Sequence, residues 1–197
     1  MSLVGRRDDL VCAALIVALA VVVTWPLFVG DVLFYGDFGD WFLPARELVA
    51  RELHAGQLPL WNPHVGLGAP LLGNPLVGAL YPFALIQLLG DDRVWLGLTV
   101  PMHLVWGGLG SYALARSFGA RPVASLVAGA AMTAGAIPLA GAESLYTLWS
   151  LSWLPWIFLT LHRALNARSW RWAVSTGACV GMLVLAGDVA RLVDVAF

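Results

Sequence analysis

The stretch VWLGLTVPMHLVWGGLGSYALA, residues 94–115, contains no Asp, Glu, Lys or Arg. A helix needs about 20 predominantly apolar residues to cross a hydrocarbon core about 30 Å thick. Three further uncharged runs of this kind occupy residues 10–30, 122–142 and 144–162, and a weaker run covers 172–187. These runs predict an all-α protein whose helices cross a membrane several times.

The composition of the whole chain agrees with this prediction. Of its 197 residues, 60% are hydrophobic and only 12% are charged, whereas soluble domains carry about 25% charged residues. The formal net charge is -1, so the charge predicts no nucleic-acid partner. Cys12 and Cys179 both lie in apolar runs, where free cysteine behaves as a small packing residue, and their spacing matches no disulfide or zinc pattern.

The N-terminus has one feature of a secretory signal peptide, because Arg6 and Arg7 precede an apolar run. The run is longer than a typical signal core, however, and it ends in Trp25-Pro26 without a small-x-small cleavage site. We therefore interpret residues 10–29 as a retained first membrane helix.

The positive-inside rule orients the helices, because cytoplasmic loops carry an excess of arginine and lysine. Arg6 and Arg7 place the N-terminus, residues 1–9, in the cytoplasm. The chain is then expected to form one membrane domain over residues 1–197, with an external loop over 30–93. The expected spans are residues 10–29, 94–115, 122–141, 145–162 and 172–189.

The apolar segment 76–90 decides the number of crossings, because it is short and Pro82 interrupts it. If it does not cross, the cytoplasmic side holds the arginines at positions 6, 7, 116, 121, 163, 168 and 171. If it does cross, the last five of these move outside, against the rule. We therefore expect five crossings, with 76–90 as an interfacial or re-entrant helix. The outer face is then acidic, which suits cation or proton handling or simple solvation of the loops.

A second helix is predicted in the external loop, over residues 41–54. Its apolar stripe comprises Trp41, Phe42, Ala45, Leu48, Val49 and Leu53, and its polar face comprises Arg46, Glu47, Arg51 and His54. Gly56 suits the end of such a helix, which we expect to lie in the membrane interface. The segment that follows is uncharged but rich in Pro, Gly and Trp, so we expect it to cover a cavity at the outer mouth of the bundle.

Several motifs lie in order along this loop: Gly36-Asp37 and then Pro44, Gly56-Gln57-Leu58-Pro59-Leu60-Trp61-Asn62-Pro63, Gly68-Ala69-Pro70-Leu71, and Tyr81-Pro82. Looser matches are His103, the stretch 107–112 and Trp153-Leu154-Pro155. In these motifs the chain resembles the YfhO-like bacterial membrane proteins, relatives of the GT-C glycosyltransferases. It departs from them at Gly187-Asp188-Val189-Ala190, where relatives often have Gly-His-Pro-Gln.

The resemblance implies a GT-C-like fold in the bacterial plasma membrane. It also implies transfer of a sugar from a polyprenyl-phosphate donor to a cell-envelope acceptor, outside the cytoplasm. The expected partners are therefore membrane lipid and the lipid-linked sugar, while the oligomeric state stays open. Because the family implies a longer protein, we expect this chain to be an N-terminal part of one and to be inactive alone.

The expected chemistry needs a general base for the attacking hydroxyl and a cation for the departing phosphate. Asp37 aligns with the first-loop acid of the family, and Asp40 is the second candidate base. The alternatives are a turn residue for Asp37 and a helix cap for Asp40. Either arginines or a divalent cation would neutralise the phosphate, which leaves the cofactor unknown.

The candidate substrate-binding residues are Arg46, Arg51, Trp61, Asn62, His64, Arg93 and Glu143. The alternative for the arginines is a solvated or snorkelling side chain, and for Glu143 a loop acid. Trp61 is a candidate to stack on a sugar ring. His64 is also a candidate metal ligand, although no recognised set of metal ligands is present. His103 lies within a span, where a neutral hydrogen-bonded packing role competes with a functional one.

Two rival functions remain open from the sequence. A transporter or flippase-like protein would use the same outer cavity, but it would need charges inside the spans, and these are scarce. A non-catalytic membrane scaffold is the second rival.

Overall fold

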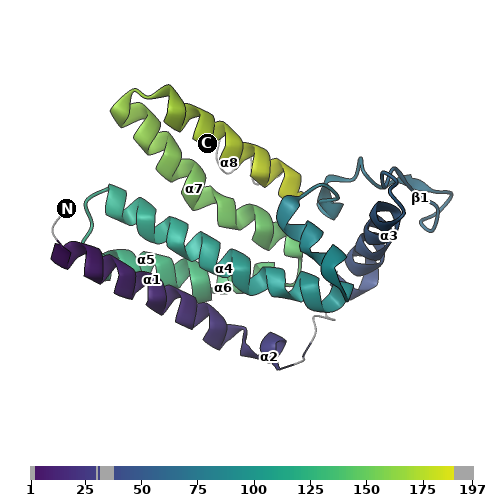
Figure 1. The fold of residues 1–197 in the computed structure, drawn as a ribbon, viewed down its shortest axis with the longest axis horizontal. Helices are drawn as coiled ribbons and strands as arrows, with labels where there is room; N and C mark the ends of the chain where they lie inside the picture. The colour runs from purple at the N-terminus through teal and green to yellow at the C-terminus, as the bar shows by residue number, and fades with distance from the viewer. Residues whose placement is uncertain (1–2, 30, 32–37, 189–197) are drawn as a thin grey trace.

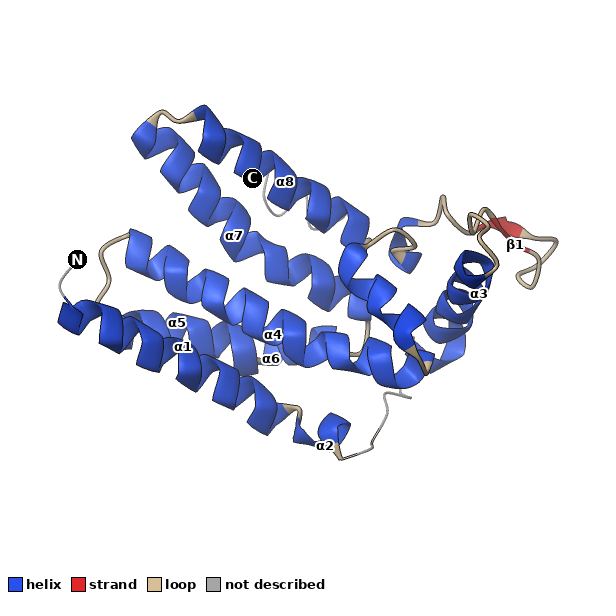
Figure 2. Cartoon of the chain, viewed as in Figure 1, coloured by secondary structure: helices blue, strands red, loops and turns tan. Residues whose placement is uncertain are grey.

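The computed structural model describes residues 3–29, 31 and 38–188 of the chain. Within these residues there are eight α-helices, three short π- or 3-10-helical segments and one two-stranded hairpin. The fold is therefore all-α in class, as the uncharged runs predict, and Figure 2 shows how little of it is strand.

The long helices form a bundle along the long axis of the molecule (Figure 1). They are α1 (Leu3–Val23), α4 (Asp92–Ser117), α5 (Pro122–Ala134) with its continuation α6 (Ala136–Gly141), α7 (Leu145–Ala167) and α8 (Trp170–Ala186). Helix α4 lies centrally and packs against α1, α5 and α7, while α8 packs against α7.

Side-chain contacts fix the direction of each helix. Asp9 near the start of α1 pairs with Arg116 at the end of α4, so these two helices are antiparallel. Helices α4 and α7 run parallel, because Trp149 in the first turn of α7 donates to Thr99 near the start of α4 at 2.9 Å. Helix α8 then returns antiparallel to α7 after a tight turn at 168–169.

Because the helices run in these directions, the arginines expected on the cytoplasmic side lie at one end of the bundle, which we call the basic end (Figure 1). It carries Arg7, Arg116, Arg121, Arg163, Arg168 and Arg171. The opposite end, which we call the cap end, carries the described residues between 24 and 91 together with the turn between α6 and α7. Leu27 lies beside Gly97 at this end. The chain thus leaves α1 and enters α4 at the same end, so the cap segment does not traverse the bundle.

The cap is built from short elements. They are α2 (Trp25–Phe28), the π-helix η1 (Phe38–Phe42), α3 (Leu43–His54), strands β1 (Trp61–Asn62) and β2 (Ala69–Pro70), and the 3-10 helices η2 (Pro75–Val77) and η3 (Pro82–Leu89). Helix α3 occupies most of the 41–54 range expected from the sequence, with π-helical geometry at its start.

In place of one helix over 76–90, the structure has η2 and η3 separated by residues 78–81. Pro75 and Pro82 each begin a new 3-10 turn, where the missing amide hydrogen is not needed. Gly78 between them has φ of 59°, a left-handed conformation that suits glycine. The two prolines and this glycine therefore divide the expected helix.

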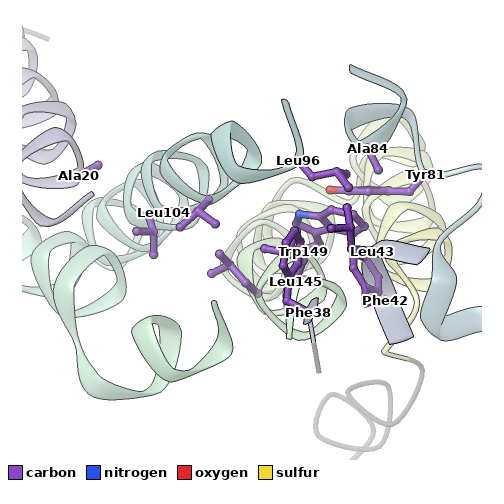
Figure 3. Packing of buried hydrophobic residues seen from close by; sticks show 13 residues of the cluster. Ala20, Phe38, Phe42, Leu43, Tyr81, Ala84, Leu96, Leu104, Leu145 and Trp149 are labelled. Atoms are coloured by element: carbon purple, nitrogen blue, oxygen red, sulfur yellow. The ribbon is translucent and has the colours of Figure 1, made fainter. Parts of the chain in front are cut away.

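The largest part of the core lies where the cap meets α4 and α7 (Figure 3). Trp149 is fully buried there, with Phe42, Tyr81 and Leu145 around it. The Trp149 ring meets those of Phe42 and Tyr81 at centroid distances of 5.7 Å and 5.2 Å. Truncating a buried tryptophan typically costs about 3–5 kcal/mol, so this ring is a main anchor of the cap.

Small residues bring the bundle helices close together. A Cβ on Gly108 would overlap Thr133 and Ile16, and one on Gly129 would overlap Ile16. Helices α1, α4 and α5 therefore cross through Gly108, Gly129 and Ile16, the kind of small-residue contact that is common between helices in membranes.

One helical stretch of the described residues, Pro122–Gly141, is long and apolar enough to cross a membrane by length and composition alone. A break at Gly135 divides it into α5 and α6, because the backbone there is extended. Helix α8 is apolar but shorter. Helix α1 carries four charged residues over 6–9, and α4 and α7 are rich in Trp, Gly, Ser and Thr. The sequence therefore anticipates five spans, of which one meets this criterion.

Candidate functional site

A polar groove lies in the cap between α3 and the β1–β2 hairpin and has a volume of about 540 Å³. Its polar lining consists of Asp40, Glu47, Arg51, Asn62, His64 and Asn74, and its apolar lining includes Trp41, Pro44 and Leu71. Four residues predicted from the sequence as site candidates thus meet here, namely Asp40, Arg51, Asn62 and His64. They come from two segments, one around α3 and one in the hairpin.

Helix α3 supplies one wall of the groove. Pro44 occupies its first turn, where proline is favoured because the amide hydrogens there have no partner in the helix. Glu47 and Arg51 follow at intervals that keep them on the same face of the helix. Arg51 is exposed and Glu47 is half-buried. Within residues 38–188, Arg51 forms no ion pair with Glu47 or Asp40. The charged groups of these three side chains therefore remain available to a ligand.

The hairpin supplies the opposite wall. Trp61 pairs with Pro70 and Asn62 with Ala69 across the two strands, and the Leu71 amide donates to the Leu60 carbonyl at 2.9 Å. Asn62 is nearly buried, and its Oδ1 accepts a 2.9 Å hydrogen bond from the His64 amide. This Asx turn fixes the backbone that carries the His64 side chain into the groove lining.

Trp61 does not line the groove. Gly68 has φ of 102°, and a Cβ there would overlap the Trp61 indole, which therefore lies against the glycine backbone. Trp41 lines the groove instead, with its ring edge-on to Phe42 at 5.8 Å. The tryptophan that lines the groove is thus Trp41, and its position next to Asp40 was the signal in the sequence. Glu47 is a second groove residue absent from the predicted set.

Arg46 is expected from the sequence to bind substrate on the polar face of α3, but it is fully buried away from the groove. Its Nε donates to Gln87 Oε1 at 3.0 Å, and Nη2 donates to the Ala84 carbonyl at 3.0 Å. Its Nη1 donates to the Val77 and Gly78 carbonyls at 3.2 Å and 2.8 Å. The guanidinium is thereby used to hold η2 and η3 on α3, and it is not available for a substrate phosphate.

Burial lowers the pKa of the Arg46 guanidinium to about 9, and the charge of Asp92 acts in the opposite direction. Arg46 therefore stays charged at neutral pH. Gln87 completes the cluster, because its Nε2 donates back to the Arg46 carbonyl at 3.0 Å. Burial also raises the pKa of Asp92, and Glu47 adds to this increase by repulsion. The charges of Asp92 and Arg46 thus influence each other, and the charge of Glu47 acts on Asp92.

The remaining candidates lie elsewhere. Asp37 falls outside the described residues. Arg93 is exposed in the first turn of α4, where its amide donates to the cap residue Asp91 at 2.9 Å. Glu143 is exposed in the turn between α6 and α7. Neither Arg93 nor Glu143 lines the groove.

A second polar cluster is buried below the cap, around His103 of α4. His103 Nδ1 lies 2.7 Å from the Thr99 carbonyl, which can only accept, so Nδ1 carries the proton. Nε2 must then accept, and the Tyr81 hydroxyl donates to it at 2.7 Å. Trp153 Nε1 in turn donates to the Tyr81 oxygen at 2.8 Å. All these groups are satisfied internally, so His103 has the hydrogen-bonded packing role that was the alternative to function.

This cluster connects three parts of the fold. Tyr81 lies in the cap between η2 and η3, while His103 and Trp153 lie in the bundle helices α4 and α7. Burial raises the pKa of the Tyr81 hydroxyl, which keeps it protonated as a donor. The cluster therefore fixes the cap on the bundle and, with Arg46, fixes the frame in which the groove is held.

Among the described residues, no group of three or more His, Cys, Asp or Glu side chains is placed to hold a metal ion. The groove thus offers two carboxylates, one arginine, one histidine and two amides, a set suited to hydrogen-bonding a polyhydroxylated or phosphorylated ligand. No protein-family model matches the chain, and no significant match exists among curated proteins or solved structures.

Proposed function

We propose that this chain is a multi-pass protein of the bacterial plasma membrane. The support is the distribution of its side chains. Large apolar residues are exposed along the outer faces of α1, α5, α6, α7 and α8, among them Leu10, Val22, Val123, Val127, Ile137, Leu165 and Val174. Polar residues lie inside the bundle, among them Thr99, His103, Thr133, Ser150 and Ser152. Exposed apolar surface of this extent on one body favours a lipid environment.

The two ends of the bundle supply the orientation of the proposal. The basic end meets the cytoplasm under the positive-inside rule. The cap end, which carries Asp31, Asp40, Glu47, Glu52, Asp91, Asp92 and Glu143, faces the opposite side. This arrangement supports five crossings with the groove outside the cytoplasm.

The proposed activity is transfer of a sugar from a polyprenyl-phosphate donor to a cell-envelope acceptor, with this chain as the N-terminal part of the enzyme. One observation carries it: Asp40, Arg51, Asn62 and His64 meet in a single groove at the outer end of an apolar bundle. In this proposal the carboxylate is the base, Arg51 is the cation, and Asn62 and His64 are the hydrogen-bonding groups that would meet the head group of a lipid-linked donor.

The reaction assigns each group a role. The Asp40 carboxylate accepts the proton of the attacking hydroxyl while that oxygen bonds to the sugar C1. The bond from C1 to the phosphate oxygen breaks at the same time, and Arg51 stabilises the departing phosphate. Asn62 and His64 orient the sugar hydroxyls, and Trp41 provides an aromatic face for the ring. Asp37, which lies outside the described residues, remains the other candidate base from the sequence.

A transporter receives less support, because the uncharged spans lack the ionisable residues that a solute or ion path uses. Among the described bundle residues, the buried His103 is fully occupied by Tyr81 and Thr99. A scaffold does not account for the meeting in one groove of Asp40, Glu47 and Arg51, which form no ion pair within the described residues.

The test measures sugar transfer to a cell-envelope acceptor by membranes that contain the full-length protein. The membranes are supplied with radiolabelled polyprenyl-phosphate monosaccharides. Asp40→Asn should lower transfer by about 10²–10⁴-fold, the usual loss when a general base is removed. Arg51→Gln should lower it by about 10–100-fold, because one charge-assisted contact is lost.

Glu52→Gln is the matched control, because Glu52 lies on α3 next to Arg51 but does not line the groove. It should change transfer by no more than about twofold. Equal transfer by wild type, Asp40→Asn and Arg51→Gln at matched membrane abundance would contradict the proposed site.

A further inference from the structure

A second groove lies at the other end of the molecule, between α7 and α8, and has a volume of about 550 Å³. Its walls are formed by Leu161, Ala164, Leu165, Ala173, Thr176, Gly177 and Val180. Its end at the turn between the helices is formed by Arg168, Ser169 and Trp170. The groove is thus apolar along its length and cationic at its basic end.

The charge at this end is not neutralised within the described part of the chain. Arg168 and Arg171 are both exposed, and neither forms an ion pair with a described carboxylate. Arg163 lies over the Trp172 ring at 4.7 Å from its centroid, which adds a third positive charge close to the turn. Arg168 therefore stands at the mouth of the groove, and the charges of Arg163 and Arg171 lie close to the same turn.

The turn itself is shaped to present Arg168. Helix α7 ends at Ala167, and Arg168 has φ of 46°, a left-handed conformation that residues other than glycine seldom adopt. Glycine would be the ordinary residue at this position. Trp170, which follows, is 72% exposed, as suits a tryptophan at the boundary between head groups and acyl chains.

The wall of the groove has room for a chain. A Cβ added to Gly177 or Gly181 would meet no atom within 4 Å, so α8 presents an open surface there. Leu161 and Leu165 line the facing side from α7, and Leu165 is 71% exposed. A linear acyl chain fits such a surface, because it gains contact along both helices without displacing protein atoms.

We propose that the groove between α7 and α8 binds an anionic phospholipid of the cytoplasmic leaflet, with its phosphate at Arg168, next to the charge of Arg171 at the same turn, and an acyl chain along Leu165 and Gly177. Charge complementarity selects this occupant, since basic pockets between helices on the cytoplasmic side bind anionic head groups. The inference rests on the proposed membrane placement and orientation but not on the transfer reaction or on the groove in the cap.

The test uses the protein in nanodiscs of phosphatidylglycerol and phosphatidylcholine in equal amounts, followed by native mass spectrometry of the lipids that stay bound after release into detergent. The wild type should retain phosphatidylglycerol in preference to phosphatidylcholine. Arg168→Gln should weaken this preference by roughly fivefold, the contribution of about one arginine near an anionic surface, and Arg168→Gln with Arg171→Gln should abolish it.

Two further variants separate the groove from general charge at this end. Gly177→Leu adds an apolar side chain to the groove wall at a position where its Cβ meets no atom within 4 Å, and it keeps every arginine, so it should reduce retention of both lipids. Arg121→Gln removes an exposed arginine of the basic end that does not line the groove, and it should leave the lipid preference unchanged. If Arg121→Gln lowers the preference as much as Arg168→Gln does, binding is to the charged surface and the proposal is wrong.

Competition identifies the source of the phosphate. Millimolar glycerol 3-phosphate should not displace phosphatidylglycerol, because it lacks the chain that the groove holds. Displacement by this soluble phosphate, equal retention of the two lipids by the wild type, or undiminished lipid retention in Gly177→Leu together with an unchanged preference in Arg168→Gln would overturn the inference. Membrane insertion is read separately, from the yield of each variant in the membrane fraction, so failure of the lipid site is distinguishable from failure of the membrane placement.

Discussion

Antiparallel helices are connected at both ends of the bundle, but the connections at the two ends differ in length and composition. At the basic end the connections are tight turns at 118–121 and 168–169, and Asp9 of α1 pairs with Arg116 of α4 at 2.9 Å. At the cap end, residues 24–91 connect α1 to α4, a stretch of 68 residues. A connection far longer than geometry requires indicates a functional segment, and only this end holds a polar groove whose acids and arginine have no described ion-pair partner.

The contrast extends to two arginines of the same helix. Arg46 is buried and makes four hydrogen bonds that organise the cap, whereas Arg51, five positions later, is exposed at the groove. The Arg46 guanidinium is bound by carbonyl oxygens of the cap and holds the cap elements together. Arg51 has no ion-pair partner among the described residues, so its guanidinium can contact a ligand. The same residue type therefore has opposite roles within little more than one helical turn.

The largest expected effect on stability separates these two arginines. Arg46→Met should lower the free energy of unfolding by about 3–5 kcal/mol, because four acceptors in η2, in η3 and at Gly78 lose a buried cationic partner. Arg51→Met should change it by no more than about 0.5 kcal/mol, as for an ordinary surface site. Unfolding midpoints in detergent measure both. Equal midpoints for the two variants would show that the cap does not depend on Arg46.

A smaller effect is expected at the junction between cap and bundle. Tyr81→Phe preserves the ring but leaves His103 Nε2 without its donor and Trp153 Nε1 without its acceptor, so it should destabilise the protein by about 1–3 kcal/mol. Phe83→Leu is the control, because Phe83 is partly exposed and touches the same rings without a polar role. Phe83→Leu should lower the free energy of unfolding by less than Tyr81→Phe does. The reverse order would show that the hydrogen bonds of Tyr81 do not stabilise the junction.

The smallest expected effect lies at the basic end and depends on pH. The hydrogen bond from Tyr112 and the pair with Arg116 hold the pKa of Asp9 below its usual range. The stabilisation is therefore present at neutral pH and is lost as the pH falls below about 4, where the carboxylate takes up a proton. The unfolding midpoint of the wild type should fall more between pH 7 and pH 3.5 than that of Asp9→Asn. Identical falls would show that this pair contributes nothing measurable.

The sequence predicts the bundle well because helix formation there depends on local features. Uncharged runs locate α4, α5, α7 and α8, and the prolines and Gly56 mark the ends of cap elements. The break at Gly135 was not predicted, because a single glycine within an apolar run does not reveal an extended backbone. The division of 76–90 into η2 and η3 follows from Pro75, Gly78 and Pro82, whose signals compete with the apolar pattern.

The sequence predicts only part of the groove, because the groove depends on packing between segments that are far apart in the chain. Asp40, Arg51, Asn62 and His64 meet in the groove, but Arg46 was misassigned because one face of α3 reads as uniformly polar in the sequence. That prediction assumes that α3 is covered on one side only. In the structure η3 packs on Arg46 while the hairpin faces Arg51, and packing between segments forty residues apart leaves no signal in the local periodicity.

The central claim is that the two ends of the bundle lie on opposite sides of a membrane, and cysteine labelling in intact cells tests it directly. Starting from a chain with Cys12 and Cys179 replaced by alanine, Gln57→Cys places a thiol on the exposed surface of the cap, and Ala167→Cys places one at the exposed turn of the basic end. A membrane-impermeant maleimide should label position 57 in intact cells and position 167 only after permeabilisation. Labelling of position 167 in intact cells, or of both positions equally, would contradict the account.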